Sequence, residues 1–166
     1  DVVCPDLLIS PGESPTWDRT DKPYLVTTTA EQQAGAGPFT IGPGVEIRMV
    51  SALNERQILI EETLLVNGTP GAPVLFTSDA AVPQTEDWWG VQITGSADIR
   101  HATFEYSNHG LLVLEPASVT LTGVTADMTV TATFALNAYT VSFTAGAGGT
   151  ISGTTPQTVN HGSDAT

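Results

Sequence analysis

Short apolar segments, separated by turn residues, recur along the chain and are densest between Ile58 and Val124. In the run Val45–Met49 the apolar residues alternate with the charged Glu46 and Arg48. Because successive side chains of a strand point to opposite faces, this run predicts a half-buried β-strand. Further apolar runs that predict strands are Tyr24–Thr28, Leu64–Val66 and Val74–Ser78. No stretch sustains a 3.6-residue period, so we expect an all-β fold.

The segments also resemble one another at a fixed offset. The run Gly90–Ile93 is echoed by Gly110–Val113, and the same offset relates Ile99–Phe104 to Val119–Val124. Repetition at about 20–25 residues, with two or three strands in each repeat, is typical of a β-solenoid. We therefore expect three or four coils. An N-terminal arm over residues 1–22 is expected to cover the first coil.

The charge of the chain excludes two classes of partner. Eighteen acidic and five scattered basic residues give a net charge of −13. Such a surface repels phosphate groups, so we expect no nucleic-acid binding and no docking to anionic membranes. No apolar run is long enough to span a membrane. Charged residues make up 14% of the chain, against about a quarter in average proteins. With the many Thr and Gly residues, this favours an extracellular, cell-surface location in bacteria.

The cysteine and the histidines offer little chemistry. Cys4 is the single cysteine, so an intrachain disulfide is excluded. We expect Cys4 to be a buried small residue, a free thiol near a mobile end, or half of an intermolecular disulfide. His101, His109 and His161 lack the spacing of a zinc site. The chain opens on the polar run Asp1–Asp6 without a signal peptide, as expected for the mature start of a secreted protein.

Pairs of carboxylates are candidates for catalysis, because glycoside hydrolysis, for example, needs two carboxylates across a groove. The candidates are Glu61 with Glu62, Asp79, Glu86 with Asp87, and Asp98 with Glu105. Adjacent residues of a strand point to opposite faces, so the sequential pairs do not form catalytic dyads. We assign no catalytic residue. Asp79, Glu86 and Asp87 are candidates for a Ca²⁺ site, because oxygen-rich loops suit this ion; no other cofactor is expected.

Trp17, Trp88, Trp89 and Tyr106 are candidates for an aromatic platform that contacts a sugar. If the chain is extended at Trp88 and Trp89, these two side chains point to opposite faces. One is then expected in the core and the other at the surface. An exposed Trp could contact a glycan, or it could cover a coil end or a subunit interface.

The order of several motifs along the chain resembles a known family. The motifs are Pro23–Val26, Phe39–Val45, Leu65–Thr69, Pro73–Ser78 and Asp87–Val91. Together they resemble the right-handed parallel β-helix regions of large bacterial secreted and surface proteins. The resemblance implies a short right-handed parallel β-helix over residues 23–124. Such β-helices include polysaccharide lyases and hydrolases.

The character of the amino-acid sequence changes at Thr125. Thr125–Phe134 is similar to the closing strand of internalin-type B repeats, and Tyr139–Thr166 to the opening hairpin of the next repeat. These repeats are small β-grasp-like modules of bacterial surface proteins. We expect an incomplete, β-hairpin-rich extension over residues 125–166. It is either part of a longer protein, or a hairpin packed on the end of the solenoid. Otherwise strands of another subunit complete it, a contact that would propagate into a filament.

Two functions of different classes remain. The first is a non-catalytic structural or adhesive segment of an extracellular protein. Its partners would be further copies or neighbouring surface-protein domains, with fibres formed through its C-terminal strands. The second is a carbohydrate-binding or polysaccharide-degrading β-helix, with a glycan as its partner. The lack of a catalytic constellation in the sequence favours the first, so we do not expect an enzyme.

Overall fold

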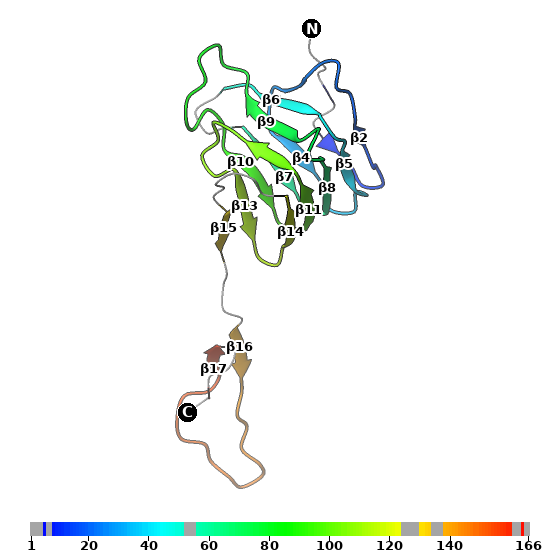
Figure 1. The fold of residues 1–166 in the computed structure, drawn as a ribbon. Coiled ribbons are helices and arrows are strands. Elements are labelled where there is room, and N and C mark those ends of the chain that lie inside the picture. The colour runs from blue at the N-terminus through cyan, green and yellow to red at the C-terminus, as the bar shows by residue number, and fades with distance from the viewer. Residues whose placement is uncertain are drawn as a thin grey trace. The chain divides into compact units, whose positions relative to one another are not determined.

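Seventeen β-strands build the described part of the chain, and none of the described residues is helical (Figure 1). The computed structural model describes residues 5, 8–51, 56–123, 130–133, 138–160 and 164. The chain divides into two compact units, Asp1–Thr133 and Phe134–Thr166. No helix of the described residues is long and apolar enough to cross a membrane.

Three parallel sheets form the first unit. The six-stranded sheet has the order β1 (Leu8–Ile9), β4 (Ala30–Gln32), β7 (Gln57–Ile60), β10 (Gly90–Ile93), β13 (Leu111–Leu114) and β15 (Val130–Thr133). The five-stranded sheet has the order β14 (Ser118–Thr122), β11 (Ser96–Arg100), β8 (Thr63–Asn67), β5 (Phe39–Ile41) and β2 (Thr16–Trp17). The four-stranded sheet has the order β12 (Ala102–Phe104), β9 (Val74–Ser78), β6 (Glu46–Met49) and β3 (Tyr24–Val26).

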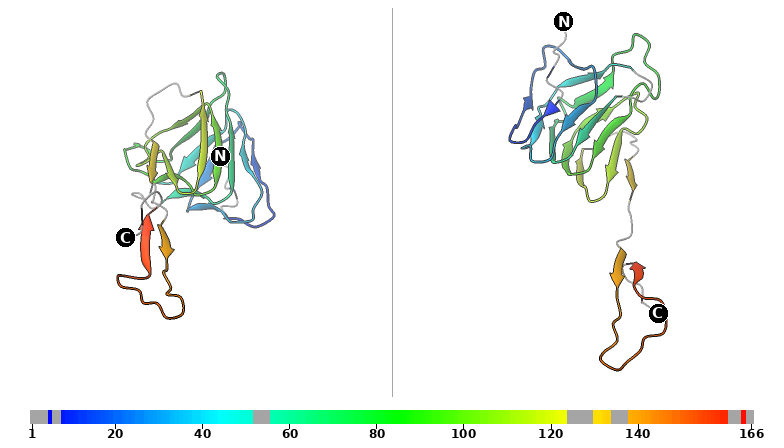
Figure 2. Two further views of the ribbon diagram at one scale, coloured as in Figure 1. Left: turned by 90° about the horizontal axis from the view of Figure 1, so that it is seen from below. Right: turned by 180° about the vertical axis from the view of Figure 1, so that it is seen from behind.

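Consecutive strands visit the three sheets in turn, and each sheet gains one parallel strand with every coil (Figure 2). β1 to β3, β4 to β6, β7 to β9 and β10 to β12 are four coils with a strand in every sheet, and β13 and β14 begin a fifth. This arrangement is a parallel β-helix. The expected fold class is confirmed: an all-β chain with a short β-helix and a hairpin in its C-terminal extension.

The register confirms one of the two sequence echoes and corrects the other. Val91 pairs with Leu111 and Ile93 with Val113, at the offset that the first echo predicted. Ile99, however, pairs with Leu121 and not with Val119. The reason is the turn between the two sheets, which is longer after β13 than after β10. The second echo is therefore displaced by two positions.

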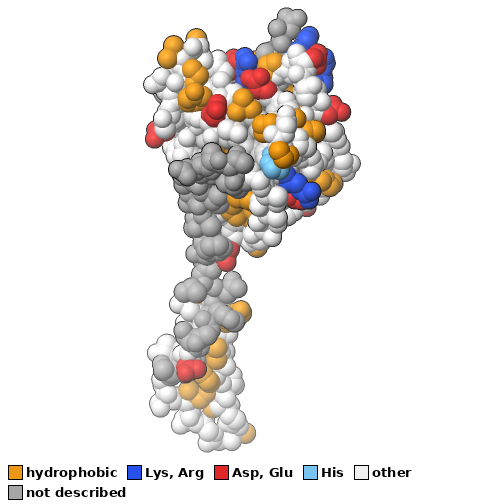
Figure 3. Space-filling view, viewed as in Figure 1, with side chains coloured by type: hydrophobic (Ala, Val, Ile, Leu, Met, Phe, Trp, Pro, Cys, Tyr) orange, Lys and Arg blue, Asp and Glu red, His pale blue; other side chains and the backbone are white. Residues whose placement is uncertain are grey.

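The interior of the β-helix is filled by one side of every strand. In β6, Ile47 and Met49 are buried while Glu46 and Arg48 point outward. From coil to coil, similar side chains stack on one another, and the rings of Phe76 and Phe104 lie parallel at 4.7 Å. Fully burying one such side chain stabilises a fold by about 1.5–3 kcal/mol. Many charged side chains of this unit lie on the face of its surface that Figure 3 shows, whereas Asp87 is buried.

Among the described residues, Gln32 is the polar residue that is fully buried, while Thr77, Ser78 and Asp87 are buried almost as deeply. The Nε2 atom of Gln32 donates hydrogen bonds to the carbonyl oxygens of Gly37 (2.8 Å) and Thr63 (3.0 Å). Its Oε1 atom accepts one from the backbone N–H of Glu62 at 3.3 Å. Buried polar groups are tolerated when they are hydrogen-bonded in this way. Gln32 therefore ties a turn of its own coil to the next coil.

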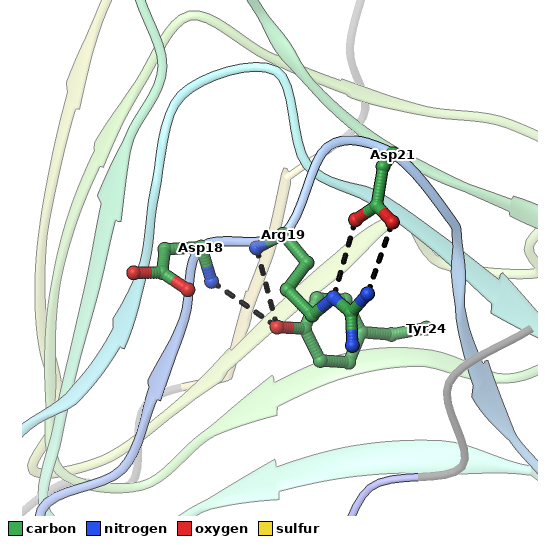
Figure 4. A network of polar contacts seen from close by, with 4 residues as sticks. All are labelled: Asp18, Arg19, Asp21 and Tyr24. Atoms are coloured by element: carbon green, nitrogen blue, oxygen red, sulfur yellow. Dashed lines mark hydrogen bonds and ion pairs between the residues drawn. The ribbon is translucent and has the colours of Figure 1, made fainter.

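The described residues of the N-terminal arm supply β1 and β2, two of the three strands of the first coil. β1 pairs with β4, and β2 pairs with β5. Trp17 stacks on Tyr24 at 4.8 Å and meets Phe39 edge-on at 4.7 Å. The Tyr24 hydroxyl accepts hydrogen bonds from the backbone N–H groups of Asp18 and Arg19 (Figure 4). Aromatic packing therefore fills the interior at this end. Cys4 lies outside the described residues.

The C-terminal part differs from the boundary that the sequence suggested after Val124. β15 pairs in parallel with β13, so the six-stranded sheet extends to Thr133. The second unit contains β16 (Ala138–Val141) and β17 (Gln157–Asn160), which form an antiparallel hairpin. The two strands are joined by residues 142–156.

Candidate functional site

The outer face of the four-stranded sheet gathers polar side chains on successive coils. Arg48 of β6 pairs in register with Thr77 of β9. The backbone N–H of Glu105, just after β12, bonds the carbonyl of Phe76, which places Glu105 beside Thr77. Neighbouring strands lie about 4.8 Å apart. Arg48, Thr77 and Glu105 thus form a row across three coils, which we call the Arg48 row.

Arg48 is held between two carboxylates. Its Nε atom donates to Oε1 of Glu46 at 2.6 Å, and a guanidinium nitrogen lies 3.7 Å from Oδ1 of Asp79. The hydrogen bond to Glu46 is the main cause of a raised pKa of Arg48; burial opposes it, and the charge of Asp79 adds to it. Arg48 is therefore a cation that Glu46 and Asp79 hold in place.

Glu105 accepts hydrogen bonds from the solenoid at two of its groups. Its Oε2 atom accepts one from the Thr77 hydroxyl at 3.2 Å. Its backbone carbonyl accepts one from the indole N–H of Trp88 at 2.9 Å. Both bonds join Glu105 to other strands and loops of the solenoid. Glu105 therefore couples the Arg48 row to the core.

Asp87 closes the loop of residues 79–87. Its Oδ2 atom accepts hydrogen bonds from the Ser78 hydroxyl (2.6 Å) and the Gln84 backbone N–H (3.0 Å), and its Oδ1 atom accepts one from the Ser51 hydroxyl (3.1 Å). Asp87 is 6% exposed. Burial raises the pKa of this carboxyl group, but the three hydrogen bonds outweigh burial and lower it. The ionised carboxylate therefore fastens the loop to two coils.

The Ca²⁺ candidates do not come together. Asp87 accepts three hydrogen bonds from the protein, and Asp79 faces Arg48. Glu86 adopts a left-handed backbone conformation with φ of 72°. Among the described residues, no three His, Cys, Asp or Glu side chains gather closely enough to hold a metal ion.

The remaining carboxylates lie apart from the Arg48 row. Glu61 and Glu62 accept hydrogen bonds from the backbone N–H groups of Ala34 (2.9 Å) and Gly35 (2.7 Å), in the turn of the preceding coil. Asp98 belongs to the five-stranded sheet, where it pairs with Arg100 at 2.6 Å. The structure therefore does not bring Asp98 together with Glu105, which follows the four-stranded sheet.

The two adjacent tryptophans differ in burial. Trp88 is fully buried and offers no surface for a ligand, whereas Trp89 is half-buried. The Trp89 ring meets the His109 ring edge-on at 4.6 Å. The backbone N–H of Trp89 bonds the carbonyl of Arg56, and that of His109 bonds the carbonyl of Trp89. Arg56, Trp89 and His109 therefore form a second row, the Trp89 row, on three coils.

Sequence reasoning missed the place of His109 and Arg56 in this row. The echo of Gly90 by Gly110 contained the signal for His109, because it also aligns Trp89 with His109. No repeat in the sequence pointed to Arg56. Arg56 lies further from Trp89 along the chain than His109 does, because the loops of its coil are longer. The Nε atom of Arg56 is buried and has no hydrogen-bond partner among the described residues.

Tyr106 lies in the loop that runs beside the 79–87 loop. It is 41% exposed, and its carbonyl accepts a hydrogen bond from the backbone N–H of Asp87 at 3.0 Å. Its φ of 61° is unusual for a bulky residue. Strained backbone of this kind costs about 1–3 kcal/mol and is often found at binding sites. Tyr106 therefore combines an exposed ring with an unusual backbone conformation, whereas Trp89 is half-buried.

A pocket of about 540 Å³ lies at the first coil, lined by Leu8, Ile9, Glu13, Pro15, Trp17 and Tyr24 among others. This volume is in the usual range for small-molecule sites. Trp17 and Tyr24 are each 5% exposed, because they stack on one another. Their faces are used by the core and are not available to stack on a ligand.

One comparison with known proteins gives a match. A family model described as a pectate-lyase-like beta helix domain matches residues 13–115, which is more than half of the chain. No curated protein and no solved structure matches the sequence. The matched segment includes β2 to β13, and so both the Arg48 row and the Trp89 row.

Proposed function

We propose that this chain, which belongs to the family of pectate-lyase-like β-helix domains, is a non-catalytic structural segment of an extracellular bacterial surface protein. One observation carries the proposal: the carboxylates that would perform cleavage serve as acceptors for the donors of the solenoid itself. These carboxylates are Glu61, Glu62, Asp87, Asp98 and Glu105. Each stabilises a turn, a loop or a strand face.

The mechanism is mechanical. The four complete coils are joined to one another by backbone hydrogen bonds in three sheets, so a load along the solenoid is shared among many parallel bonds. The net charge of −13 keeps neighbouring molecules apart laterally. The segment would act as a rigid spacer that presents other domains.

The C-terminal extension supports a surface protein as the setting. Its sequence is similar to that of internalin-type B repeats, which occur in such proteins. We infer that the extension links the spacer to further modules or to further copies of the chain. If each copy were linked to the next through its C-terminal strands, the copies would form a fibre.

A turnover assay tests the lack of catalysis. The protein at high concentration is incubated with polygalacturonate and with neutral polysaccharides, with and without Ca²⁺. We expect no release of reducing or unsaturated ends above that of the Arg48→Ala variant. Release that disappears in both Arg48→Ala and Glu105→Ala would contradict the proposal and favour a polysaccharide-degrading function.

Glycan binding is the second candidate, and the exposure of Tyr106 beside the strained 79–87 loop favours it. On this hypothesis a sugar ring packs against Trp89 or Tyr106. A glycan array would then give signals that fall at least tenfold in Trp89→Ala or Tyr106→Ala. Tyr139→Ala is the control, because Tyr139 is an exposed aromatic residue of the other unit. Signals that persist in both variants would exclude this site.

A further inference from the structure

Arg56 differs from the other arginines of the chain in its partners. Arg19, Arg48 and Arg100 each donate a hydrogen bond from Nε to an acidic side chain two residues away. The Nε atom of Arg56 is buried, and in the described part of the chain it has no hydrogen-bond partner. Among the described residues, no carboxylate forms an ion pair with Arg56. Its guanidinium is therefore a cation that these residues do not neutralise.

This unpaired guanidinium carries a cost in free energy. Buried polar groups of native proteins nearly always have a partner, and a group without one calls for an explanation such as a bound water or ion. Taking a charged group out of water is unfavourable unless an opposite charge compensates for it. A bound anion would recover part of this cost, so the unpaired guanidinium favours anion binding at Arg56.

Two aromatic rings lie on the coils that follow Arg56 in the Trp89 row. The backbone N–H of Trp89 donates a hydrogen bond of 2.7 Å to the carbonyl of Arg56, and the rings of Trp89 and His109 meet edge-on at 4.6 Å. All three residues are half-buried, and none of them carries a carboxylate. The row thus combines a cation with rings that can pack against the body of a ligand.

The charge of the chain selects the kind of anion. A protein with a net charge of −13 repels anions, and the repulsion grows with the charge of the anion. A phosphate monoester carries about −1.5 to −2 charges at neutral pH, and a polyuronate carries one charge on every sugar. A carboxylate brings a single charge, and it can accept two parallel hydrogen bonds from a guanidinium. A ligand with one carboxylate therefore fits this row best.

We propose that the Trp89 row binds a carboxylate attached to a ring, with the carboxylate on Arg56 and the ring against Trp89. Two sources share this chemistry, namely a free small acid and the terminal acidic sugar of a glycan. The inference goes beyond the proposed structural role, which requires no ligand at this row. A spacer with such a site would also have a point of attachment on its side.

An NMR titration of the full, ¹⁵N-labelled chain tests the proposal, with benzoate and glucuronate as the probes. We expect the indole N–H signal of Trp89 to shift, with a dissociation constant on the order of 1 mM for ligands of this size. The indole signals of Trp17 and Trp88 are internal controls and should stay in place, because both side chains are buried. A shift with benzoate alone identifies a free acid as the source, and a shift with glucuronate alone identifies an acidic sugar.

Neutral probes and variants separate the role of the charge from that of the ring. Benzamide and glucose lack the carboxylate and should bind at least tenfold more weakly than the acids. Arg56→Met removes the cation and should weaken binding of the acids at least tenfold. Arg19→Met is the matched control, because it removes the same charge from an exposed ion pair with Asp21. It should leave the dissociation constant within about twofold.

The urea midpoint of Arg56→Met shows whether a loss of binding reflects a loss of fold. We expect this midpoint not to fall below that of the unmodified protein, because the variant removes a buried donor that has no partner. Arg56→Lys is a second variant, which keeps the charge but not the planar fork of donors. It should bind the acids several-fold more weakly than the unmodified protein and more tightly than Arg56→Met.

Several results would overturn the inference. They are an unshifted Trp89 indole signal with both acids, equal binding of the acids and their neutral counterparts, and binding that survives Arg56→Met. Binding that appears only in Glu55→Gln would also overturn it, because a carboxylate of the chain itself would then occupy Arg56; Glu55 lies outside the described residues. Polygalacturonate that binds more tightly per sugar than glucuronate would contradict the selection of a single charge. None of these results bears on catalysis, which the turnover assay tests separately.

Discussion

The hydroxyl of Ser78 donates a hydrogen bond of 2.6 Å to the carboxylate of Asp87, at the far end of the loop that follows β9. This bond, with those from Ser51 and the Gln84 backbone, fixes the 79–87 loop against the end of β9. The carboxylate that looked like a Ca²⁺ ligand in the sequence is thus an acceptor for three donors of the fold.

Asp87→Asn should destabilise the β-helix by about 2 kcal/mol, because hydrogen bonds to a charged group are worth about 1.5–3 kcal/mol and the amide turns a donor toward other donors. The free energy of unfolding, measured with urea, checks this value. Asp79→Asn is the matched control. Its exposed partner Arg48 lies at 3.7 Å, so the loss should stay below about 1 kcal/mol. Equal losses in both variants would contradict the role of Asp87.

Gly123→Ala should destabilise the last coil by about 2 kcal/mol, because overpacking of a filled site costs about 1–3 kcal/mol. Gly123 has a φ of 72°, and a β-carbon there would overlap the imidazole of His101 on the preceding coil. The unfolding midpoint in urea is the measurement.

A double-mutant cycle separates the overlap from the backbone strain. His101→Gly removes the ring, and His101 itself has a φ of 46°, which glycine adopts readily. Gly123→Ala should therefore cost clearly less in the His101→Gly background. The same cost in both backgrounds would show that the ring does not matter.

Gln32→Leu should destabilise the fold by about 3 kcal/mol or more, although the new side chain is apolar, because each unsatisfied buried group costs about 1–3 kcal/mol. The substitution leaves the carbonyls of Gly37 and Thr63 and the N–H of Glu62 without their buried partner. Gln33→Leu is the control at the neighbouring, half-buried position. A neutral effect of Gln32→Leu on thermal unfolding would refute this account of the core.

Stability should fall as the pH drops below about 4. Hydrogen bonds from Arg19 and Arg100 lower the pKa of Asp21 and Asp98, respectively. The pKa of Asp87 is also lowered, because its three hydrogen bonds outweigh the effect of burial. A folded-state pKa below the unfolded value of about 3.9 stabilises the fold above that pH, and the gain is lost as the pH falls through the folded pKa. Urea midpoints at pH 7 and pH 3 measure this loss. Asp98→Asn should reduce the difference, and equal midpoints at the two pH values would contradict the assignment.

Much of the fold was visible in the sequence, because each strand buries one face. The alternation over Val45–Met49 predicted β6, and the echo of Gly90–Ile93 predicted the register of β10 with β13. The second echo failed because periodicity carries no information on the length of the turn at Glu115. The solenoid also continues beyond the boundary predicted after Val124, because β15 pairs with β13. The prediction missed β15 because its uncharged, Thr-rich sequence resembles the C-terminal extension more than the solenoid.

The site was less predictable for a physical reason. Its rows join residues that are adjacent in the sheets but a whole coil apart in the sequence, and loop length decides which residues meet. The different burial of Trp88 and Trp89 was predicted from the alternation of side chains along a strand: Trp88 is buried and Trp89 is half-buried. The contact of Arg48 with Asp79 was not, because Asp79 follows β9 on the next coil.

We propose that the carboxylates stabilise the solenoid and perform no chemistry. The most direct test is the free energy of unfolding of Glu62→Ala and Glu105→Ala. Removing a structural acceptor should lower it by about 0.5–1.5 kcal/mol in each variant. Active-site residues are often held at a cost to stability. A Glu105→Ala variant that is more stable than the unmodified protein would therefore contradict the claim and indicate a catalytic face.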